Sequence, residues 1–347
     1  MHDEIAWIET IAPDFLEVIR RRYHILQHIN WMQPVGRRVL AIKLDMSERA
    51  LRTETDFLRA QGLITSSKSG MVLTDNGEEA LNGLEKFMGQ ILDVHQREKQ
   101  LMALLGIDHV LIVAGDSDDQ PRVLKDIGRL VNETLRVLLP DGRNIIAVMG
   151  GTTMARVAKE LTPKLSNERE LVFVPARGGI GETVDIQANT VSADMAQRTH
   201  GTHRMLYVPE HVSKETYESL LQEPSVQAVL QMITHCNAVL HSIGDAVAMA
   251  KRRGMTTEEV NMIKSEDAVG EAFGYFFNDA GEVVYKIPRI GLQIRDLDSI
   301  PYILAIAGGR SKARAIQAYM KNAPHQTWLI TDEGAANQIL KGLAPLK

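Results

Sequence analysis

Residues 144–158 have the sequence NIIAVMGGTTMARVA. An apolar run at residues 144–149 is typical of a buried β-strand, two glycines follow it, and a helical pattern begins at Met154. Glycine lets the backbone approach an anion closely, and the N-terminus of a helix presents free N–H groups. The stretch therefore predicts a strand, an anion-binding turn and a helix, which together form the repeating unit of an α/β fold.

Strands and helices alternate in the same way from about residue 108 onward. We predict strands at residues 109–113, 144–149, 170–175, 205–208, 238–242, 303–307 and 326–330. We predict helices at residues 122–138, 154–161, 184–198, 225–234, 257–263 and 312–321. Such alternation is typical of a doubly wound, mostly parallel sheet with helices on both faces, in which ligands bind at the carboxyl ends of the strands.

Three more predicted strands end in sequences that suit an anion. These are Ala-Arg-Gly-Gly at 176–179, Gly-Gly-Arg-Ser-Lys at 308–312 and Thr-Asp-Glu-Gly at 331–334. A single Gly-Gly turn is common in tight strand-to-helix connections, but several together with Arg177 and Lys312, and with the hydroxyls of Thr152 and Thr153, favour a phosphorylated small molecule. Neither GxxxxGK[ST] nor a GxGxxG that opens a βαβ unit occurs, so a nucleotide is not indicated.

Two further segments allow more than one interpretation. The basic cluster AKRRG at residues 250–254 is either a second phosphate clamp or ordinary helix surface. The segment DAVGEAFG at residues 267–274 sets Glu271 among small and apolar residues, where it could accept hydrogen bonds from sugar hydroxyls, act as an acid or base, or only pair locally.

The N-terminal part carries a different pattern. Residues 37–61 predict two short helices interrupted near Asp45, with Ser47 as the N-cap of the second. On that helix, Arg49, Arg52 and Thr53 lie on one side, together with Asp56. Ala50, Leu51, Leu58 and Gln61 cluster on the other side, which is mainly apolar.

Gly62 ends this helix, and apolar residues on both sides of the turn SSKSG predict a β-hairpin. Helix, turn, helix and hairpin in this order indicate a winged helix-turn-helix, whose second helix enters the major groove. We predict base contacts by Arg49, Arg52 and Thr53, and phosphate contacts by Arg37, Arg38, Lys43 and Lys68. Ser47, at the start of the second helix, is also counted among the DNA-binding residues. The alternatives are that these cations are a solvated face, or that the winged helix serves only protein assembly.

The charge distribution agrees with a separate module for a polyanion. The 347-residue chain has a formal net charge of −5, yet residues 20–68 contain ten Lys and Arg against four Asp and Glu. Length alone favours at least two domains. We expect a winged-helix domain at residues 1–90, a linking and oligomerising helix at 91–107, and an effector domain at 108–347.

A 3–4 spacing of apolar residues runs along the expected helix 74–105. Its positions are Leu81, Leu84, Met88, Ile91, Met102 and Leu105. This stripe either pairs two subunits or packs on the adjacent domains, and both can hold along different parts.

Other features of the sequence indicate the compartment in which the protein functions. The single cysteine, Cys236, excludes an intrachain disulfide and fits a reducing compartment. The N-terminal sequence lacks the pattern of a signal peptide and no apolar run is long enough to cross a bilayer, so we expect a cytoplasmic protein without membrane contact. His200, His203, His235 and His241 show no recognised ligand spacing, so we expect no metal.

Several motifs resemble one bacterial family along essentially the whole chain. They are GRR at residues 36–38, VMGGTTMARVA, VPARGGIGE, QANT, EAFGYFFN, AIAGGRSKARAI and TDEGAA. The sequence resembles the central glycolytic genes regulators of Gram-positive bacteria, within the SorC/DeoR-type repressors. The resemblance implies a homo-oligomeric repressor, tetrameric on its operator DNA, that controls genes of the triose-phosphate stage of glycolysis and is induced by fructose 1,6-bisphosphate. It implies no cofactor.

In that family the effector domain resembles sugar-phosphate isomerases and glucosamine-6-phosphate deaminases. Matching motifs carry its ligand contacts onto Gly150, Gly151, Thr152, Thr153, Arg177, Gln187, Arg252, Glu271 and Lys312. Gln187, and the choice of Arg252 within its basic cluster, come only from the resemblance. By charge, Thr152, Thr153 and Lys312 would hold one phosphate, Arg177 and Arg252 the other, and Gln187 and Glu271 the sugar.

The rival interpretation is a sugar-phosphate isomerase or deaminase. Such an enzyme needs a positioned carboxylate base. Asp245 in the run HSIGDAVAM is similar in placement to the glycine-aspartate loop of the deaminases, but the histidine that follows there is lacking. This departure favours a regulator with no catalytic residue.

Overall fold

In a computed structural model, the chain forms two compact units, Met1–Gln96 and Arg97–Lys347. The structure describes residues 11–44, 46–67, 69–178, 183–208, 214–287 and 289–342, without the side chains of Pro13, Leu16 and residues 85–93. No helix in these ranges combines the length and the apolar composition that a bilayer span requires.

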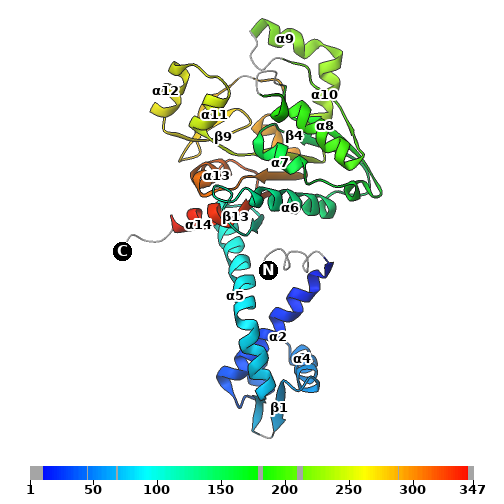
Figure 1. The fold of residues 1–347 in the computed structure, drawn as a ribbon, viewed down its shortest axis with the longest axis vertical. Coiled ribbons are helices and arrows are strands. Elements are labelled where there is room, and N and C mark those ends of the chain that lie inside the picture. Colours follow the sequence, from blue (N-terminus) through cyan, green and yellow to red (C-terminus); the bar gives the residue numbers. More distant parts are fainter. Residues whose placement is uncertain are drawn as a thin grey trace. The chain divides into compact units, whose positions relative to one another are not determined.

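The N-terminal unit is a winged helix, as predicted. Its elements are α2 (Pro13–Met32), α3 (Arg37–Lys43), α4 (Glu48–Ala60), the antiparallel strands β1 (Ile64–Ser67) and β2 (Gly70–Leu73), and the first part of α5 (Asp75–Leu105) (Figure 1). Val35 forms a further antiparallel bridge to Met71 of β2. Helix α2 was not predicted. Its side chains Ile25 and Ile29 are fully buried in the core of this unit.

The buried face of α4 differs in part from the prediction. Leu51, Glu54, Thr55 and Leu58 face the core, whereas Ala50 and Gln61 are exposed. Glu54 faces the core because Arg21 and Arg22 of α2 pair with its carboxylate at 3.3 and 2.9 Å. Two of the cations in the basic segment therefore serve an internal contact.

The side chain of Ser47 caps α4, as predicted, by accepting a hydrogen bond from the Ala50 N–H at 3.2 Å. We expect Ser47→Ala to destabilise the first turn of α4 by about 1 kcal/mol, because this N–H loses its partner. Hydrogen exchange of the α4 amides in DNA-free protein should then be faster. Ser47→Asp, which keeps an acceptor at the cap, should stay near the wild type. Equal exchange in the alanine variant would contradict the cap's importance.

Helix α5 uses its apolar stripe in both units. Leu81 is buried in the N-terminal core, with Leu84 packed beside it. In the second unit, Leu105 is buried and Met102 is half-buried, and the neighbouring Leu101, which is not part of the predicted stripe, is fully buried. The side chains of Met88 and Ile91 lie outside the described residues. The two ends of the stripe therefore pack within the units themselves.

The second unit is built on a seven-stranded sheet in the order β3-β13-β12-β7-β4-β5-β6, with every described pair parallel. The strands are β3 (His109–Val113), β4 (Gly142–Val148), β5 (Arg169–Pro175), β6 (Thr202–His203), β7 (Ala238–Ser242), β12 (Tyr302–Ile306) and β13 (Thr327–Asp332). The predicted doubly wound α/β fold is confirmed.

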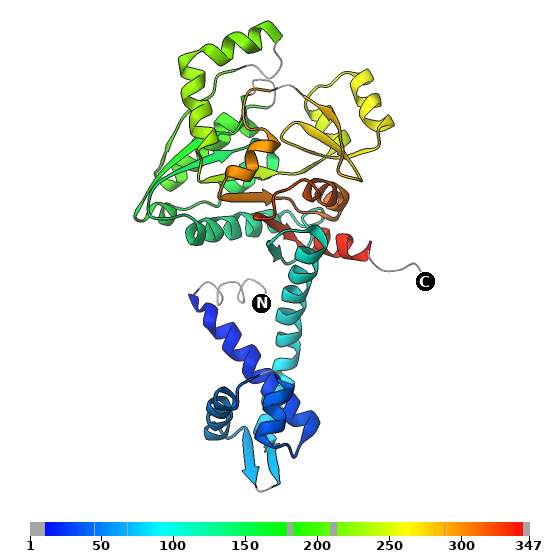
Figure 2. The same cartoon turned by 180° about the vertical axis from the view of Figure 1, so that it is seen from behind.

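Helices pack on both faces of this sheet (Figures 1 and 2). One face packs on α6 (Arg122–Leu138), α7 (Thr152–Ala158) and α8 (Ala188–Thr199), and their side chains share one core with alternate residues of the strands. The strands also contact α10 (Pro224–Thr234) and α14 (Glu333–Lys341). The remaining helices are α9 (Lys214–Gln222), α11 (Ala246–Arg252), α12 (Thr257–Ser265) and α13 (Ala313–Met320), with short 3-10 turns η1 (Pro163–Ser166), η2 (Val184–Ile186), η3 (Ile294–Ser299) and η4 (Arg310–Lys312).

Two predictions in this unit were wrong. Residues 205–208 form no strand, because the Asn189 side chain holds both the N–H and the carbonyl of Leu206 in place of a neighbouring strand. Residues 184–198 are not one helix, because Gln187 has an extended backbone and separates η2 from α8.

A small antiparallel sheet in the order β11-β10-β9-β8 was also missed. It comprises β8 (Gly244–Asp245), β9 (Ala268–Ala272), β10 (Tyr275–Asn278) and β11 (Val283–Lys286).

The direction of chain winding reverses between β4 and β7. From β4 the chain continues outward to β5 and β6, whereas from β7 it continues in the opposite direction to β12 and β13. In open α/β sheets the crevice outside the carboxyl ends of two such strands is where ligands bind. The residues that follow β4 and β7 are therefore the first place to look for a site.

Candidate functional site

The glycine turn after β4 lies at this reversal. Gly151 has a φ of +122°, and its N–H donates to the Ile186 carbonyl at 2.8 Å. A Cβ added at Gly150 would lie 2.4 Å from the same carbonyl oxygen, and one added at Gly151 would lie 3.4 Å from the Ser242 hydroxyl at the end of β7. Gly150 is needed because the backbone of residues 186–188 lies against it, and Gly151 is needed because a residue with a side chain rarely adopts its positive φ.

Three predicted residues surround this turn. Thr152 and Thr153 are the first residues of α7, the former exposed and the latter buried, and Gln187 is the N-cap residue of α8. The contact of Gly150 and Gly151 with residues 186–188 brings these helix starts together. Their N–H groups suit a negatively charged ligand.

Lys312 and Arg252 lie within electrostatic range of each other. Burial lowers the pKa of the Lys312 ammonium, the Asp118 carboxylate raises it, the positive charge of Arg252 lowers it again, and Asp332 raises it. Lys312 ends the turn after β12, and Arg252 is the last residue of α11. An anion between these two cations would relieve their repulsion.

Arg177 is buried just after β5, and its backbone forms a bridge with Gly291. A Cβ at Gly291, whose φ is +142°, would lie 2.6 Å from the Cα of Arg177, so only glycine fits beside it. Residues 179–182, the remainder of this glycine-rich segment, lie outside the described residues.

Glu271 is engaged within the protein. Its carboxylate pairs with the Arg253 guanidinium at 2.9 Å, where both side chains are only 3% exposed, and it accepts the Gly274 N–H at 2.6 Å. Of the two adjacent arginines, Arg253 therefore faces the interior and Arg252 the surface. Glu271 also pairs in register with Gly244 of β8, next to the end of β7.

Carboxylates surround the Gly308–Gly309 turn, which sequence analysis did not foresee. Asp332 accepts the Gly309 N–H at 2.7 Å and the Ser117 N–H at 2.9 Å. Asp118 accepts both the N–H and the hydroxyl of Ser311, at 2.8 and 3.0 Å. The sequence signal was the acidic run GDSDD at residues 115–119, directly after a predicted strand.

Asp245 has a structural role. It caps α11 by accepting the Ala248 N–H at 2.8 Å. Because the carboxylate already accepts this hydrogen bond, the structure gives no support to the interpretation of Asp245 as a catalytic base.

His241 is part of the core. It hydrogen-bonds the Tyr319 hydroxyl at 3.2 Å, and burial lowers the pKa of His241 to about 3, so the imidazole is neutral. Among the described residues, no three His, Cys, Asp or Glu side chains gather as a metal site would require.

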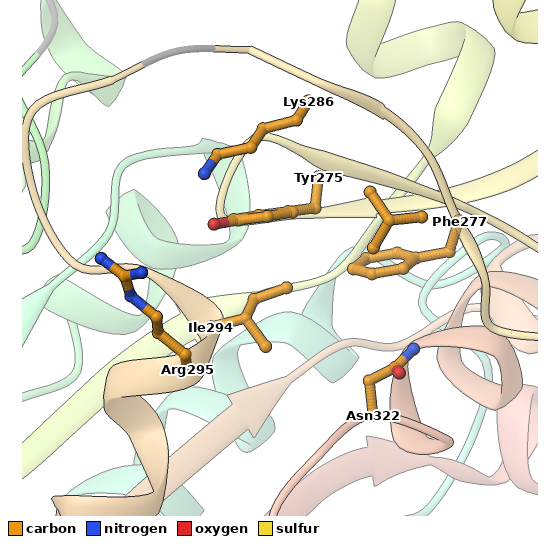
Figure 3. Close-up of a pocket in the computed structure, with 7 residues that line it drawn as sticks. Tyr275, Phe277, Lys286, Ile294, Arg295 and Asn322 are labelled. Atoms are coloured by element: carbon orange, nitrogen blue, oxygen red, sulfur yellow. The ribbon is translucent and has the colours of Figure 1, made fainter.

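A shallow cavity of about 250 Å³ lies elsewhere in this unit, against the small sheet (Figure 3). Tyr275, Phe277 and Ile294 contribute to its lining, and the Lys286 ammonium lies 4.8 Å from the centre of the Tyr275 ring. None of the nine predicted effector residues lines it.

The predicted DNA contacts lie on α3 and α4. Arg38, Lys43, Arg49, Arg52 and Thr53 are exposed, and so is Ser47, the N-cap residue of α4. The Arg52 side chain is 69% exposed, with Asp56 at 3.8 Å. Arg37 is half-buried near the same Asp56, and Lys68 lies outside the described residues. Four exposed cations and a hydroxyl on one helix pair suit a polyanion such as a DNA backbone.

Comparison with known proteins identifies both units. The family model of the CggR N-terminal DNA binding domain matches residues 18–88, and the Sugar-bind family model of a sugar-binding domain matches residues 90–341. The central glycolytic genes regulator of Bacillus subtilis is 47% identical over 341 residues, with 98% of this chain and 99% of that protein covered. That of Priestia megaterium is 44% identical over 331 residues, with 95% and 96% covered.

Solved structures support the same assignment. A chain described as a SorC family transcriptional regulator from Enterococcus faecalis shares 60% identity and a TM-score of 0.68, over 71% of this chain and 100% of that one. The full-length sorbitol operon regulator SorC of Klebsiella pneumoniae, at 16% identity, shares the fold with a TM-score of 0.61 over 95% of this chain and 100% of that one.

Fold and relatives together define a transcription regulator, not an enzyme, with an N-terminal DNA-binding domain and a C-terminal sugar-binding domain. The chain belongs to the family of the central glycolytic genes regulators, within the SorC-type regulators, and the resemblance predicted from its motifs is confirmed.

Proposed function

We propose that this protein represses genes of the triose-phosphate stage of glycolysis and that fructose 1,6-bisphosphate releases it from its operator. The protein is then a cytoplasmic homo-oligomer, tetrameric on double-stranded operator DNA, and it needs no cofactor. Two similar relatives are named central glycolytic genes regulators, and these names support the proposal that the target genes are glycolytic.

One observation carries the choice of a phosphorylated effector. Lys312 ends the glycine turn after β12, which lies next to β7 in the sheet, and the positive charge of Arg252 opposes that of the Lys312 ammonium. A phosphate would neutralise that repulsion and accept the free N–H groups. The buried Arg177 after β5 supplies a further cation for a ligand with two phosphates.

The effector acts by preferring one arrangement of the subunits. A ligand changes DNA affinity only if it binds the two arrangements with different free energies. In this proposal the bisphosphate closes the sugar-binding domain and alters how the subunits present their winged helices to the operator.

Fluorescence anisotropy tests this function directly. Labelled DNA from upstream of the host's glycolytic operon is titrated with protein at fixed salt, with and without fructose 1,6-bisphosphate. We expect tight binding that the sugar weakens or makes less cooperative. Tight DNA binding that does not change when the sugar is added would exclude this effector. Equal binding to operator and unrelated DNA would exclude a sequence-specific repressor.

Within the DNA-binding domain, we expect Arg52→Ala to weaken operator binding by about 1–3 kcal/mol, because an arginine that donates twice to a base edge is lost. Binding of fructose 1,6-bisphosphate should stay unchanged. Arg143→Ala is a charge-matched control, since this arginine is 60% exposed and lies on β4 in the other unit. Anisotropy with operator and with random DNA separates base reading from phosphate contact, and an unchanged operator affinity would remove Arg52 from the interface.

A further inference from the structure

The loop between β3 and α6 lies against the turn that carries Lys312. Its Asp118 carboxylate accepts the Ser311 N–H at 2.8 Å and the Ser311 hydroxyl at 3.0 Å. A Cβ at Gly309 would lie 2.4 Å from an oxygen of the same carboxylate. Asp118 therefore lies directly on the turn between β12 and α13.

These are the donors that a phosphate uses. A backbone N–H and a hydroxyl at the beginning of a helix, beside an ammonium group, form a typical phosphate contact. The Asp118 carboxylate also raises the pKa of Lys312, against the larger effect of burial. The described structure thus has an anion of the protein itself on the Ser311 donors.

We propose that Asp118 competes with the effector's phosphate for the Ser311 donors and the charge of Lys312, and so determines the affinity of the site. The inference rests on the proposed function, because it requires a phosphate at this turn. Two anions cannot share one set of donors, so binding requires the carboxylate to leave. The free energy of its departure is subtracted from the affinity of the ligand.

The rest of the loop has its own anchors. Asp332 holds the Ser117 N–H at 2.9 Å, and the Arg310 guanidinium donates to Asp116 at 2.8 Å and to Asp119 at 2.5 Å. The Asp118 side chain is exposed, and its carboxylate takes part in none of these three contacts. Its replacement therefore leaves the anchors of the loop intact.

Isothermal titration of the full-length protein with fructose 1,6-bisphosphate, and separately with inorganic phosphate, tests this competition. We expect Asp118→Asn to bind fructose 1,6-bisphosphate about five- to tenfold more tightly than the wild type, since a charge-assisted contact no longer opposes binding. Asp194→Asn is the control, because it removes the same charge from α8, where Asp194 pairs with Arg198 at 3.1 Å. It should match the wild type.

The outcomes separate this inference from the proposed function. If the wild type binds fructose 1,6-bisphosphate and Asp118→Asn binds it with equal or weaker affinity, the competition is overturned. The proposed effector is then retained. No binding in any of the proteins overturns both. Equal tightening in Asp194→Asn assigns the effect to net charge and also overturns the competition.

A second measurement needs no variant. In the wild type, saturating fructose 1,6-bisphosphate should shift the side-chain carboxyl carbon resonance of Asp118 toward that of a solvent-exposed aspartate, because the carboxylate leaves the Ser311 N–H and hydroxyl. An unchanged Asp118 resonance in the bound state overturns the competition, even if Asp118→Asn does not fold.

Discussion

Lys312→Ala is expected to bind fructose 1,6-bisphosphate about 100-fold more weakly than the wild type, which corresponds to about 2.7 kcal/mol. The reason is the position of the ammonium, half-buried beside the turn after β12, with Arg252 in electrostatic range. Without Lys312 the phosphate loses a charged donor that water cannot fully replace there. Operator binding in the absence of sugar should stay the same, so the variant should be a repressor that the sugar no longer releases.

Calorimetry with the sugar and anisotropy with operator DNA measure the two halves of this expectation. Lys251→Ala is the matched control, because Lys251 is an exposed lysine on α11 next to Arg252. It should keep induction. If Lys312→Ala instead abolished operator binding, the assignment of DNA binding to one domain and sugar binding to the other would be wrong.

Arg253→Ala is expected to destabilise the sugar-binding domain by about 3–5 kcal/mol. The substitution leaves the Glu271 carboxylate, 3% exposed in the wild type, without its 2.9 Å ion pair. A buried charge without a partner is far more costly than a pair exchanged for apolar groups. Chemical denaturation of the full chain, together with hydrogen exchange over β9 and α11, should show the loss.

The double variant Arg253→Met with Glu271→Leu separates the two effects. It removes both charges and fills similar volume, so it should recover most of the lost stability. A double variant as unstable as Arg253→Ala would mean that Arg253 acts through other contacts. An Arg253→Ala protein as stable as the wild type would mean that the ion pair is not important for folding.

Local patterns were enough to predict most strands and the glycine turns. The segment around Gly150 carries its whole signal within 15 residues, and the structure has the predicted strand, turn and helix there. The winged helix was predictable for the same reason, since the cap at Ser47 and the hairpin are contacts between near neighbours.

Contacts between distant parts of the chain could not be predicted in this way. Asp118 and Ser311 are 193 residues apart, and their meeting depends on the order of strands in the sheet. The choice between Arg252 and Arg253 depends on the phase of α11, which has only 7 residues and no clear apolar period. Glu54 is buried because of α2, a helix absent from the prediction.

The last turns of α5 have a consequence for where the chain can be divided. Glu98 accepts the Ile112 N–H of the edge strand β3 at 3.1 Å, and Arg97 shares the Glu333 carboxylate with the Gly115 N–H. An uncovered edge strand is a template for association with other chains. Proteolysis just before Arg97 would release a sugar-binding domain with its sheet edge protected. A cut after Leu105 would expose that edge and produce a fragment prone to aggregation.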